Sequence, residues 1–369
     1  MDYSPGLEGV VAGETAISDV EGDIGRLSYR GYAIEELVPL PYLNVMWLVL
    51  FGDLPSDEER ADLDAYLKVN GKLRSNEITI LSKMQKGLHP MRMLHAIIPL
   101  LELDGTYLFD GLDSEASRGL QILARIPMLI DCFVHIQNGD QVPAADNCKS
   151  YLGDFLSMCT GADVSAEDEA VLSVVQILQM EHSLNVGTFT SRVVSSTLAP
   201  VDAVFSAAVG ALFGVLHGGA DEAALNDAKR VGSPDAAVQF IDELLESKGK
   251  LMGMGHREYR TVDPRSLILK PMAERLCQGT EHENVFKTLE ALELEFNRRM
   301  NLKGKDIWAN VEFYKGAVYE ALGIPSNYFT SMFTMSRMVG WLAHFIEGRK
   351  GNKIIRPKAN YIGHEARAL

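Results

Sequence analysis

Helical periodicity is the feature that most constrains how this chain can fold. From Tyr42 onward, apolar residues recur every three or four positions, in segments that end at glycine or proline. The segment SDEERADLDAYLKVNG, residues 56–71, begins with a capping serine and ends at Gly71. No part of the chain alternates strands with helices, so a doubly wound sheet is not expected. The sequence therefore predicts an all-α protein.

Two short runs near the N-terminus are the exception to this pattern. Thr15 to Ser18 and Gly25 to Tyr29 flank the turn-like stretch DVEGD and predict a small β-hairpin. Helices are expected at residues 44–51, 56–71, 91–101, 117–137, 166–179, 202–216, 233–247 and 271–302. The length of 369 residues fits one large domain and one smaller domain.

The charge balance limits the classes of partner. A net charge of −15 argues against nonspecific nucleic-acid binding, which needs a basic surface, and means that an anionic substrate must meet a local cationic cluster. The first residues, MDYSPGLEGV, have no signal-peptide pattern, and no apolar run approaches a membrane span. The cysteines lack CxxC spacing and predict reduced thiols in a cytoplasmic protein. They are Cys132, Cys148, Cys159 and Cys277.

Three stretches combine histidine, arginine and glycine at unusual density. They are EHSLNVGTFTSRV (181–193), LHGGADEA (216–223) and GMGHREYRTVDPRS (253–266). A single histidine is most often structural, but glycine next to it lets the backbone approach a ligand closely. The histidines lack the spacing of zinc sites, so no metal is expected. The stretches also lack the Walker lysine and the GxSxG elbow of hydrolases.

Arginines in or near these stretches indicate the chemistry of the ligand. They are Arg260, Arg265, Arg337 and Arg356. Guanidinium groups suit bidentate recognition of carboxylates, although a structural ion pair is an equal alternative for each one. Together with the histidines, they favour a small polycarboxylate substrate.

Glu312, in NVEFYKGAVYEALGIP (310–325), permits two interpretations. A carboxylate at the start of a helix is favoured by the helix dipole and can simply be solvated. It can also be a general base directed into a site.

The chain resembles the short bacterial and archaeal type of the citrate synthase family over essentially its whole length. The segments that carry the resemblance are GLEGVVAGETAIS, GRLSYRGY, EHSLNVGTFTSRVVSST, LHGGADEA, GMGHREYRTVDPR, NVEFY, ALGIP, SRMVGWLAH and IIRPKANYIG. The resemblance implies a two-domain helical fold, with residues 1–216 and 323–369 in a large dimer-forming domain and 217–322 in a small domain that closes over coenzyme A. It also implies a homodimer that needs no cofactor.

The resemblance assigns a role to each chemistry-bearing residue. His217 matches the histidine that stabilises the enol of acetyl-CoA, His256 the one that polarises the ketone of oxaloacetate, and Glu312 the base. His182, Arg265 and Arg337 match oxaloacetate-binding residues, and Arg356 matches an arginine that reaches the neighbouring subunit's site. The residues expected to bind coenzyme A are Lys250, Leu251, Met252, Gly253, Met254, Gly255, Arg260 and Asn310.

The base position departs from the family's usual pattern, in which it is an aspartate. The extra methylene of Glu312 displaces the carboxylate by roughly 1 Å, and an error of that size can cost on the order of 100-fold in rate. The alternative is a backbone adjusted to compensate. The sequence favours an enzyme with a misplaced base and reduced activity, for which Glu312→Asp would raise kcat.

Two nearby positions also differ from the family. Asp221 stands where asparagine is common, and Glu258 stands at a usually apolar position. Three functions therefore stay open. Citrate synthase is the first, 2-methylcitrate synthase acting on propionyl-CoA is the second, and a non-catalytic protein that binds coenzyme A or a dicarboxylate is the third.

Overall fold

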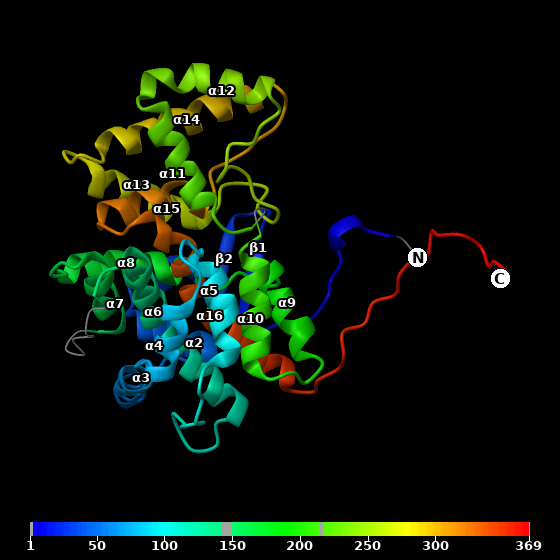
Figure 1. The fold of residues 1–369 in the computed structure, drawn as a ribbon. Coiled ribbons are helices and arrows are strands. Elements are labelled where there is room, and N and C mark those ends of the chain that lie inside the picture. Colours follow the sequence, from blue (N-terminus) through cyan, green and yellow to red (C-terminus); the bar gives the residue numbers. More distant parts are fainter. Residues whose placement is uncertain (1–2, 142–149, 215–216, 369) are drawn as a thin grey trace.

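The chain folds almost entirely into helices, and the prediction of a mostly helical fold is confirmed (Figure 1). The computed structural model describes residues 3–141, 150–214 and 217–368. The first helices are α1 (Ile34–Leu37), α2 (Tyr42–Phe51), α3 (Asp57–Asn70), α4 (Ser75–Lys83), α5 (Pro90–Ile97), α6 (Ser114–Asn138), α7 (Tyr151–Thr160) and α8 (Ala166–Gln179). The remainder are α9 (Val186–Ser195), α10 (Val201–Leu212), α11 (Ala220–Val231), α12 (Ala237–Glu246), α13 (Pro264–Cys277), α14 (Glu283–Asn301), α15 (Val311–Ala321) and α16 (Phe329–Arg349). Short 3₁₀ turns are η1 (Pro5–Leu7), η2 (Ile98–Leu100), η3 (Pro234–Ala236) and η4 (Ser326–Tyr328).

Local sequence signals explain where several helices begin and end. Ser56 caps α3 by accepting a hydrogen bond from the amide of Glu59, and Gly52 ends α2 in the left-handed conformation. The predicted helix at residues 271–302 is wrong in extent, since α13 begins earlier and a break at 278–282 separates it from α14. Five helices, α4, α7, α9, α11 and α16, were not predicted.

The N-terminal hairpin exists, but its first strand lies later than predicted. A three-stranded antiparallel sheet has the order β1 (Ser18–Glu21), β2 (Arg26–Tyr29) and β3 (Tyr32–Ala33), and Ser18 pairs with Tyr29. The prediction of a strand at 15–18 is wrong because the chain turns at 22–25, so DVE belongs to the strand and not to the turn.

Two long helices form the centre of the core. Helix α16 is buried from Phe329 to Phe345, and α6 packs against it. Among the described residues, α6 is the helix long and apolar enough to cross a membrane, and 83% of its most apolar window is buried inside the protein. Such burial is usual for the core helix of a globular protein.

Figure 1 shows helices α11 to α15 grouped on one side of the remaining helices. Within this group, α15 packs on α11 and α13, and α14 packs on α11 and α12. The group corresponds to the expected small domain, whose boundaries at 217 and 322 stay a prediction. The β1–β2 turn reaches the loop that precedes α13, where the amide of Arg260 donates a hydrogen bond to the carbonyl of Gly22 at 3.0 Å.

Both ends of the chain run away from the helical body as extended segments (Figure 1). The C-terminal segment exposes large apolar side chains, with 78% of Tyr361 and 91% of Ile362 accessible. Cys132, Cys159 and Cys277 are buried free thiols, and Cys148 lies outside the described residues.

Candidate active site

His182 lies just after α8 and contacts the loop that carries His256. Its Nε2 atom is 3.0 Å from the hydroxyl of Tyr259, and its ring centroid is 5.0 Å from that of His256. His182 is buried, and burial followed by the positive charge of Arg265 holds its pKa well below the ordinary value.

A buried acid fixes the segment before His182. The Oε1 atom of Glu181 accepts a hydrogen bond from the hydroxyl of Ser18 at 3.0 Å, and it lies 2.9 Å from the Nε2 atom of His344. The main-chain carbonyl of Glu181 accepts a hydrogen bond from Tyr29. The β-sheet and α16 therefore hold the segment 181–183 from two sides.

Arg265 is positioned by its own helix cap. Asp263 caps α13, and its carboxylate accepts hydrogen bonds from Nε and Nη2 of Arg265 at 3.0 and 2.8 Å. The Nη2 atom of Arg265 also lies 3.5 Å from Nε2 of His256. Both members of this ion pair are buried, and such a pair is rigid because either partner alone would leave an uncompensated buried charge.

Arg337 enters the same region from α16. Its Nε atom donates a hydrogen bond to the main-chain carbonyl of Gln179 at 2.7 Å, and its guanidinium lies 5.0 Å from the ring centroid of Phe333. Arg337 interacts electrostatically with Arg265 and with Glu312. Two arginines of like charge are thus held near each other, an arrangement that a ligand with several carboxylates would stabilise.

His217 also lies beside Phe333, with the two ring centroids 6.3 Å apart. Within the described residues its Nε2 atom is buried and has no hydrogen-bond partner. A buried polar atom without a partner is costly, so this nitrogen is suited to a ligand. Burial, with Arg337 as the next cause, lowers the pKa of His217 to about 4.

His256 is also neutral near pH 7. Burial and Arg265 lower its pKa to about 4, against the opposing effect of Asp263. A neutral imidazole can donate one N–H to a ligand oxygen without carrying charge. His217 and His256 are therefore both suited to hydrogen-bond a carbonyl oxygen.

Glu312 lies in the first turn of α15, whose N-terminal cap, Asn310, is hydrogen-bonded to the loop at residues 250–255. Asn310 caps the helix by accepting a hydrogen bond from the amide of Glu312 at 2.9 Å, and its Nδ2 donates to the carbonyl of Gly255 at 2.8 Å. The amide of Asn310 donates to the carbonyl of Gly253. Gly253 has a positive φ, and a Cβ there would lie 2.9 Å from Cα of Phe313, so only glycine allows this close approach.

The carboxylate of Glu312 is not a solvated helix-terminal charge. Glu312 is 8% exposed, and Oε2 accepts a hydrogen bond from Nζ of Lys315, one turn along α15. Burial raises the pKa of Glu312, Lys315 opposes that rise, and the negative charge of Asp221 adds to it. A carboxylate in this environment is a stronger base than one in water.

The remaining predicted residues lie outside this cluster. Arg356 is exposed on the C-terminal segment, and Lys250 and Arg260 are exposed near the loop at 250–263. Leu251 and Gly253 are buried in that loop, while Met252, Met254 and Gly255 are half-buried. Within one chain, then, the structure gathers the histidines, two arginines and Glu312, but not Arg356.

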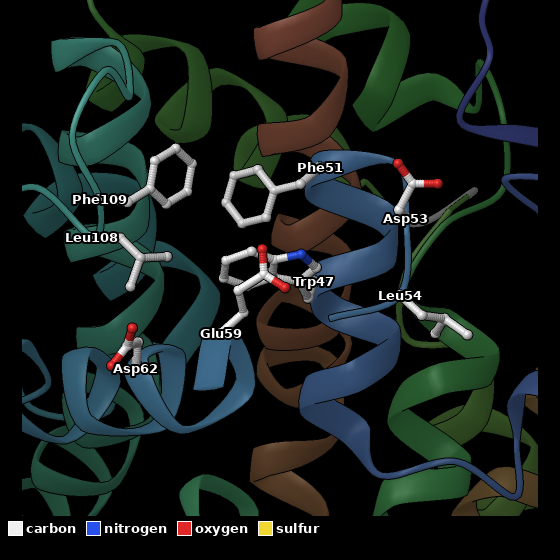
Figure 2. Close-up of a pocket in the computed structure, with 8 residues that line it drawn as sticks. All are labelled: Trp47, Phe51, Asp53, Leu54, Glu59, Asp62, Leu108 and Phe109. Atoms are coloured by element: carbon white, nitrogen blue, oxygen red, sulfur yellow. The ribbon is translucent and has the colours of Figure 1, made fainter. Parts of the chain in front are cut away.

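A separate hollow of about 420 Å³ lies between α2, α3 and the segment 103–113 (Figure 2). None of its lining residues belongs to the cluster described above. The rings of Trp47, Phe51 and Phe109 pack against one another there, with centroids 4.6 to 6.1 Å apart. Among the described residues, no group of three or more His, Cys, Asp or Glu side chains is arranged to hold a metal ion.

Five residues of the cluster were missed by the sequence analysis. They are Gln179, Tyr259, Asp263, Lys315 and Phe333. Lys315 could have been found, because side chains three positions apart share one helix face. The contacts of Gln179 and Phe333 depend on packing between distant segments, for which the sequence carries no local signal.

The fold and site define a class of protein: a helical enzyme in which neutral histidines, carboxylate-binding arginines and a buried base meet at one place. The particular family follows from comparison with known proteins. The chain belongs to the citrate synthase family, since the family model described as "Citrate synthase, C-terminal domain" matches residues 6–358. It is an enzyme of the acyltransferase class.

Individual relatives agree over the full length of the chain. A citrate synthase of Deinococcus radiodurans is 36% identical, with 98% of this chain and 96% of that protein covered. A 2-methylcitrate synthase of Corynebacterium glutamicum is 32% identical, with 100% and 97% covered. The citrate synthase of Thermoplasma acidophilum, solved with carboxymethyl coenzyme A and oxaloacetate, has a TM-score of 0.92 at 28% identity and covers 100% of this chain and 98% of its own.

Proposed function

We propose that this protein condenses acetyl-CoA with oxaloacetate and water, giving citrate and coenzyme A. The observation that carries the proposal is the cluster itself: two neutral histidines, paired arginines and a buried carboxylate, contributed by both groups of helices. The 36% identical citrate synthase supports the same assignment.

Oxaloacetate would bind between the two groups of helices. Arg265 and Arg337 would pair with its carboxylates, and His182, held by Tyr259, would donate a further hydrogen bond. His256, 3.5 Å from Arg265, would donate an N–H to the ketone oxygen and make the ketone carbon more electrophilic.

The acyl methyl group would lose its proton to Glu312. The C–H electron pair moves into the C–C bond of the enol(ate), and negative charge develops on the thioester oxygen, where the N–H of His217 would stabilise it. The buried Nε2 atom of His217 has the free hydrogen-bonding capacity that this role needs. The enol carbon then attacks the ketone of oxaloacetate, and water hydrolyses the resulting citryl thioester.

Coenzyme A would bind along the loop 250–255, whose glycines at 253 and 255 have positive φ and bring the backbone close to a ligand. Lys250 and Arg260 are exposed next to it and would meet the phosphates, with Asn310 fixing the loop to α15. The proposed reaction needs only these side chains and a water molecule, so we propose that the enzyme uses no cofactor.

We further propose a cytoplasmic homodimer in which the partner's Arg356 completes each site. The exposed Arg356 on an extended segment with Ile354, Tyr361 and Ile362 supports this arrangement, because large apolar side chains on such a segment favour contact with a second surface. Buried free cysteines support a reducing compartment.

Propionyl-CoA is the second candidate substrate, since relatives of 32 to 33% identity are 2-methylcitrate synthases. A non-catalytic binding protein is the third possibility. Thiol release from purified protein with oxaloacetate and either acyl-CoA separates them. We expect release with a higher kcat/KM for acetyl-CoA. A preference for propionyl-CoA would assign the second function, and no release with either would exclude both enzymes.

A further inference from the structure

Three charged side chains meet at the base position. Lys315 is 0% exposed on its side chain, hydrogen-bonds Glu312 and forms an ion pair with Oδ2 of Asp221 at 3.1 Å. Its Nζ atom also donates to Oε1 of Gln179 at 2.7 Å and lies 4.5 Å from the ring centroid of Phe333. The ammonium is thus held by α8, α11, α15 and α16 at once.

The packing of α11 on α15 brings Asp221 into this cluster. The helices approach closely at Gly316, where a Cβ would lie 2.9 Å from the carbonyl oxygen of Asp221. Asp221 sits in the first turn of α11, where negative charge is favoured, and its Oδ1 accepts a hydrogen bond from the amide of Glu222. Its other oxygen is buried and faces Lys315.

Charge balance distinguishes this cluster from a simple ion pair. With both carboxylates ionised, the three groups carry a net charge of −1, and uptake of one proton by Glu312 brings them to zero. Arg265 and Arg337 add positive charge near Glu312 in either state. Without Asp221, the same proton uptake would leave Lys315 as a buried, uncompensated ammonium, which is unfavourable in a low-dielectric interior. Asp221 therefore matters most at the moment when Glu312 is protonated.

We propose that Lys315 and Asp221 are positioning residues for Glu312: Lys315 holds the carboxylate in place, and Asp221 balances that ammonium while Glu312 carries the substrate proton. This inference rests on the proposed function. The proton passes from the acyl methyl carbon to a carboxylate oxygen of Glu312, and the electron pair stays on the substrate as its enol(ate). At both Glu312 and Asp221 the sequence departs from the family's usual residue. The ammonium of Lys315 contacts both of these carboxylates.

Opposite pH shifts in two variants would test the proposal. Asp221→Asn removes a negative charge but keeps the oxygen that accepts from the amide of Glu222. The acid limb of the pH profile, where kcat/KM falls because Glu312 becomes protonated, should therefore move about one pH unit lower. Lys315→Met removes the positive charge, so the limb should move about one unit higher. Lys315→Met should also lower kcat about 10-fold or more with the KM for oxaloacetate little changed.

Two further variants control for loss of structure. The double variant Lys315→Met/Asp221→Asn removes one charge of each sign, so it should fold even if Lys315→Met does not. The acid limb of its pH profile should lie between those of the single variants. Lys270→Met breaks the ion pair of Lys270 with Glu293, next to the ring of Tyr314 and without contact to Glu312, and should leave the pH profile unchanged. Shifts of both single variants in one direction, or no shift in either, would overturn the proposal.

A direct titration separates this inference from the proposed function. If the wild-type protein releases no thiol with either acyl-CoA, the proposed function fails. The carboxyl carbon of Glu312 can still be titrated by NMR in ¹³C-glutamate-labelled protein, assigned with Glu312→Gln. A titration displaced to lower pH in Asp221→Asn and to higher pH in Lys315→Met, with the double variant between them, would support the positioning roles. Identical titrations in all proteins would refute them.

Discussion

The Nε2 atom of His182 and the hydroxyl oxygen of Tyr259 lie 3.0 Å apart and join the two groups of helices at the candidate site. His182 follows α8 in one group, whereas Tyr259 belongs to the loop that carries His256 and leads into α13 in the other. His182 is therefore oriented by a residue from the opposite group of helices. A site built in this way is complete only when the two groups are in contact.

Loss of the Tyr259 hydroxyl should weaken oxaloacetate binding more than it slows the reaction. In Tyr259→Phe, His182 loses a buried hydrogen bond worth about 1 kcal/mol, so the KM for oxaloacetate should rise about 5- to 10-fold. Tyr314→Phe is a matched control, because that hydroxyl donates a hydrogen bond to Glu293 of α14. Steady-state kinetics at varied oxaloacetate would measure the effect, and equal KM values for the two variants would contradict it.

Shortening the base should lower activity. The sequence alone favours a rise in kcat for Glu312→Asp, but the contact of Glu312 with Lys315 reverses this expectation. An aspartate would withdraw its carboxylate by roughly 1 Å from the ammonium, and misplacement of that size can cost on the order of 100-fold. Stopped-flow or steady-state thiol release would decide the direction. A kcat above that of the wild type would show that Glu312 is a misplaced base.

Stability should fall as the solution becomes acidic through the range of the site histidines. The pKa values of His217 and His256 are about 4 in the folded protein, below the ordinary 6.5, so the unfolded chain binds more protons between these values. Their contribution to stability is therefore lost progressively as pH falls from 6.5 towards 4, by about 1–2 kcal/mol per histidine at pH 5. Urea unfolding at pH 7 and pH 5 should show a smaller loss for His217→Gln than for the wild type.

A side chain at Gly22 should disturb the loop that carries His256. A Cβ on Gly22 would lie 2.0 Å from the carbonyl oxygen of Glu258, so Gly22→Ala must push the β1–β2 turn and the loop apart. We expect a several-fold loss of kcat/KM, because displacements of about 1 Å disturb reacting geometry. Gly214→Ala is the control, since its nearest neighbour would lie at 3.4 Å. Wild-type kinetics in Gly22→Ala would show that the loop does not need this contact.

Two inactive variants should restore activity to each other if Arg356 serves the partner subunit. In a mixed dimer of Arg356→Ala and Glu312→Gln chains, one site receives the intact Glu312 of the first chain and the intact Arg356 of the second. Co-expression with two affinity tags would isolate the mixed dimer. About half of the wild-type activity is expected, because one of its two sites is complete. Mixed dimers as inactive as their parents would place Arg356 in its own chain's site, and an active Arg356→Ala parent would show that Arg356 serves neither site.

The short signals of the sequence were sufficient for the helical class and for the boundaries of a few helices. Ser56 and Gly52 act through contacts within a few residues, so α2 and α3 could be located without knowledge of the fold. The first strand was misplaced because its limits depend on pairing of Ser18 with Tyr29, which no local propensity encodes.

The sequence by itself determined which residue types could carry the chemistry, because the histidine, arginine and glycine motifs are local. Only the tertiary structure decided their environment. The burial of Glu312 depends on the packing of α8, α11 and α16 against α15. The same packing brings Gln179, Asp221 and Phe333 around Lys315. Burial and charge coupling arise from packing between segments far apart in the chain, and these set the basicity of a carboxylate.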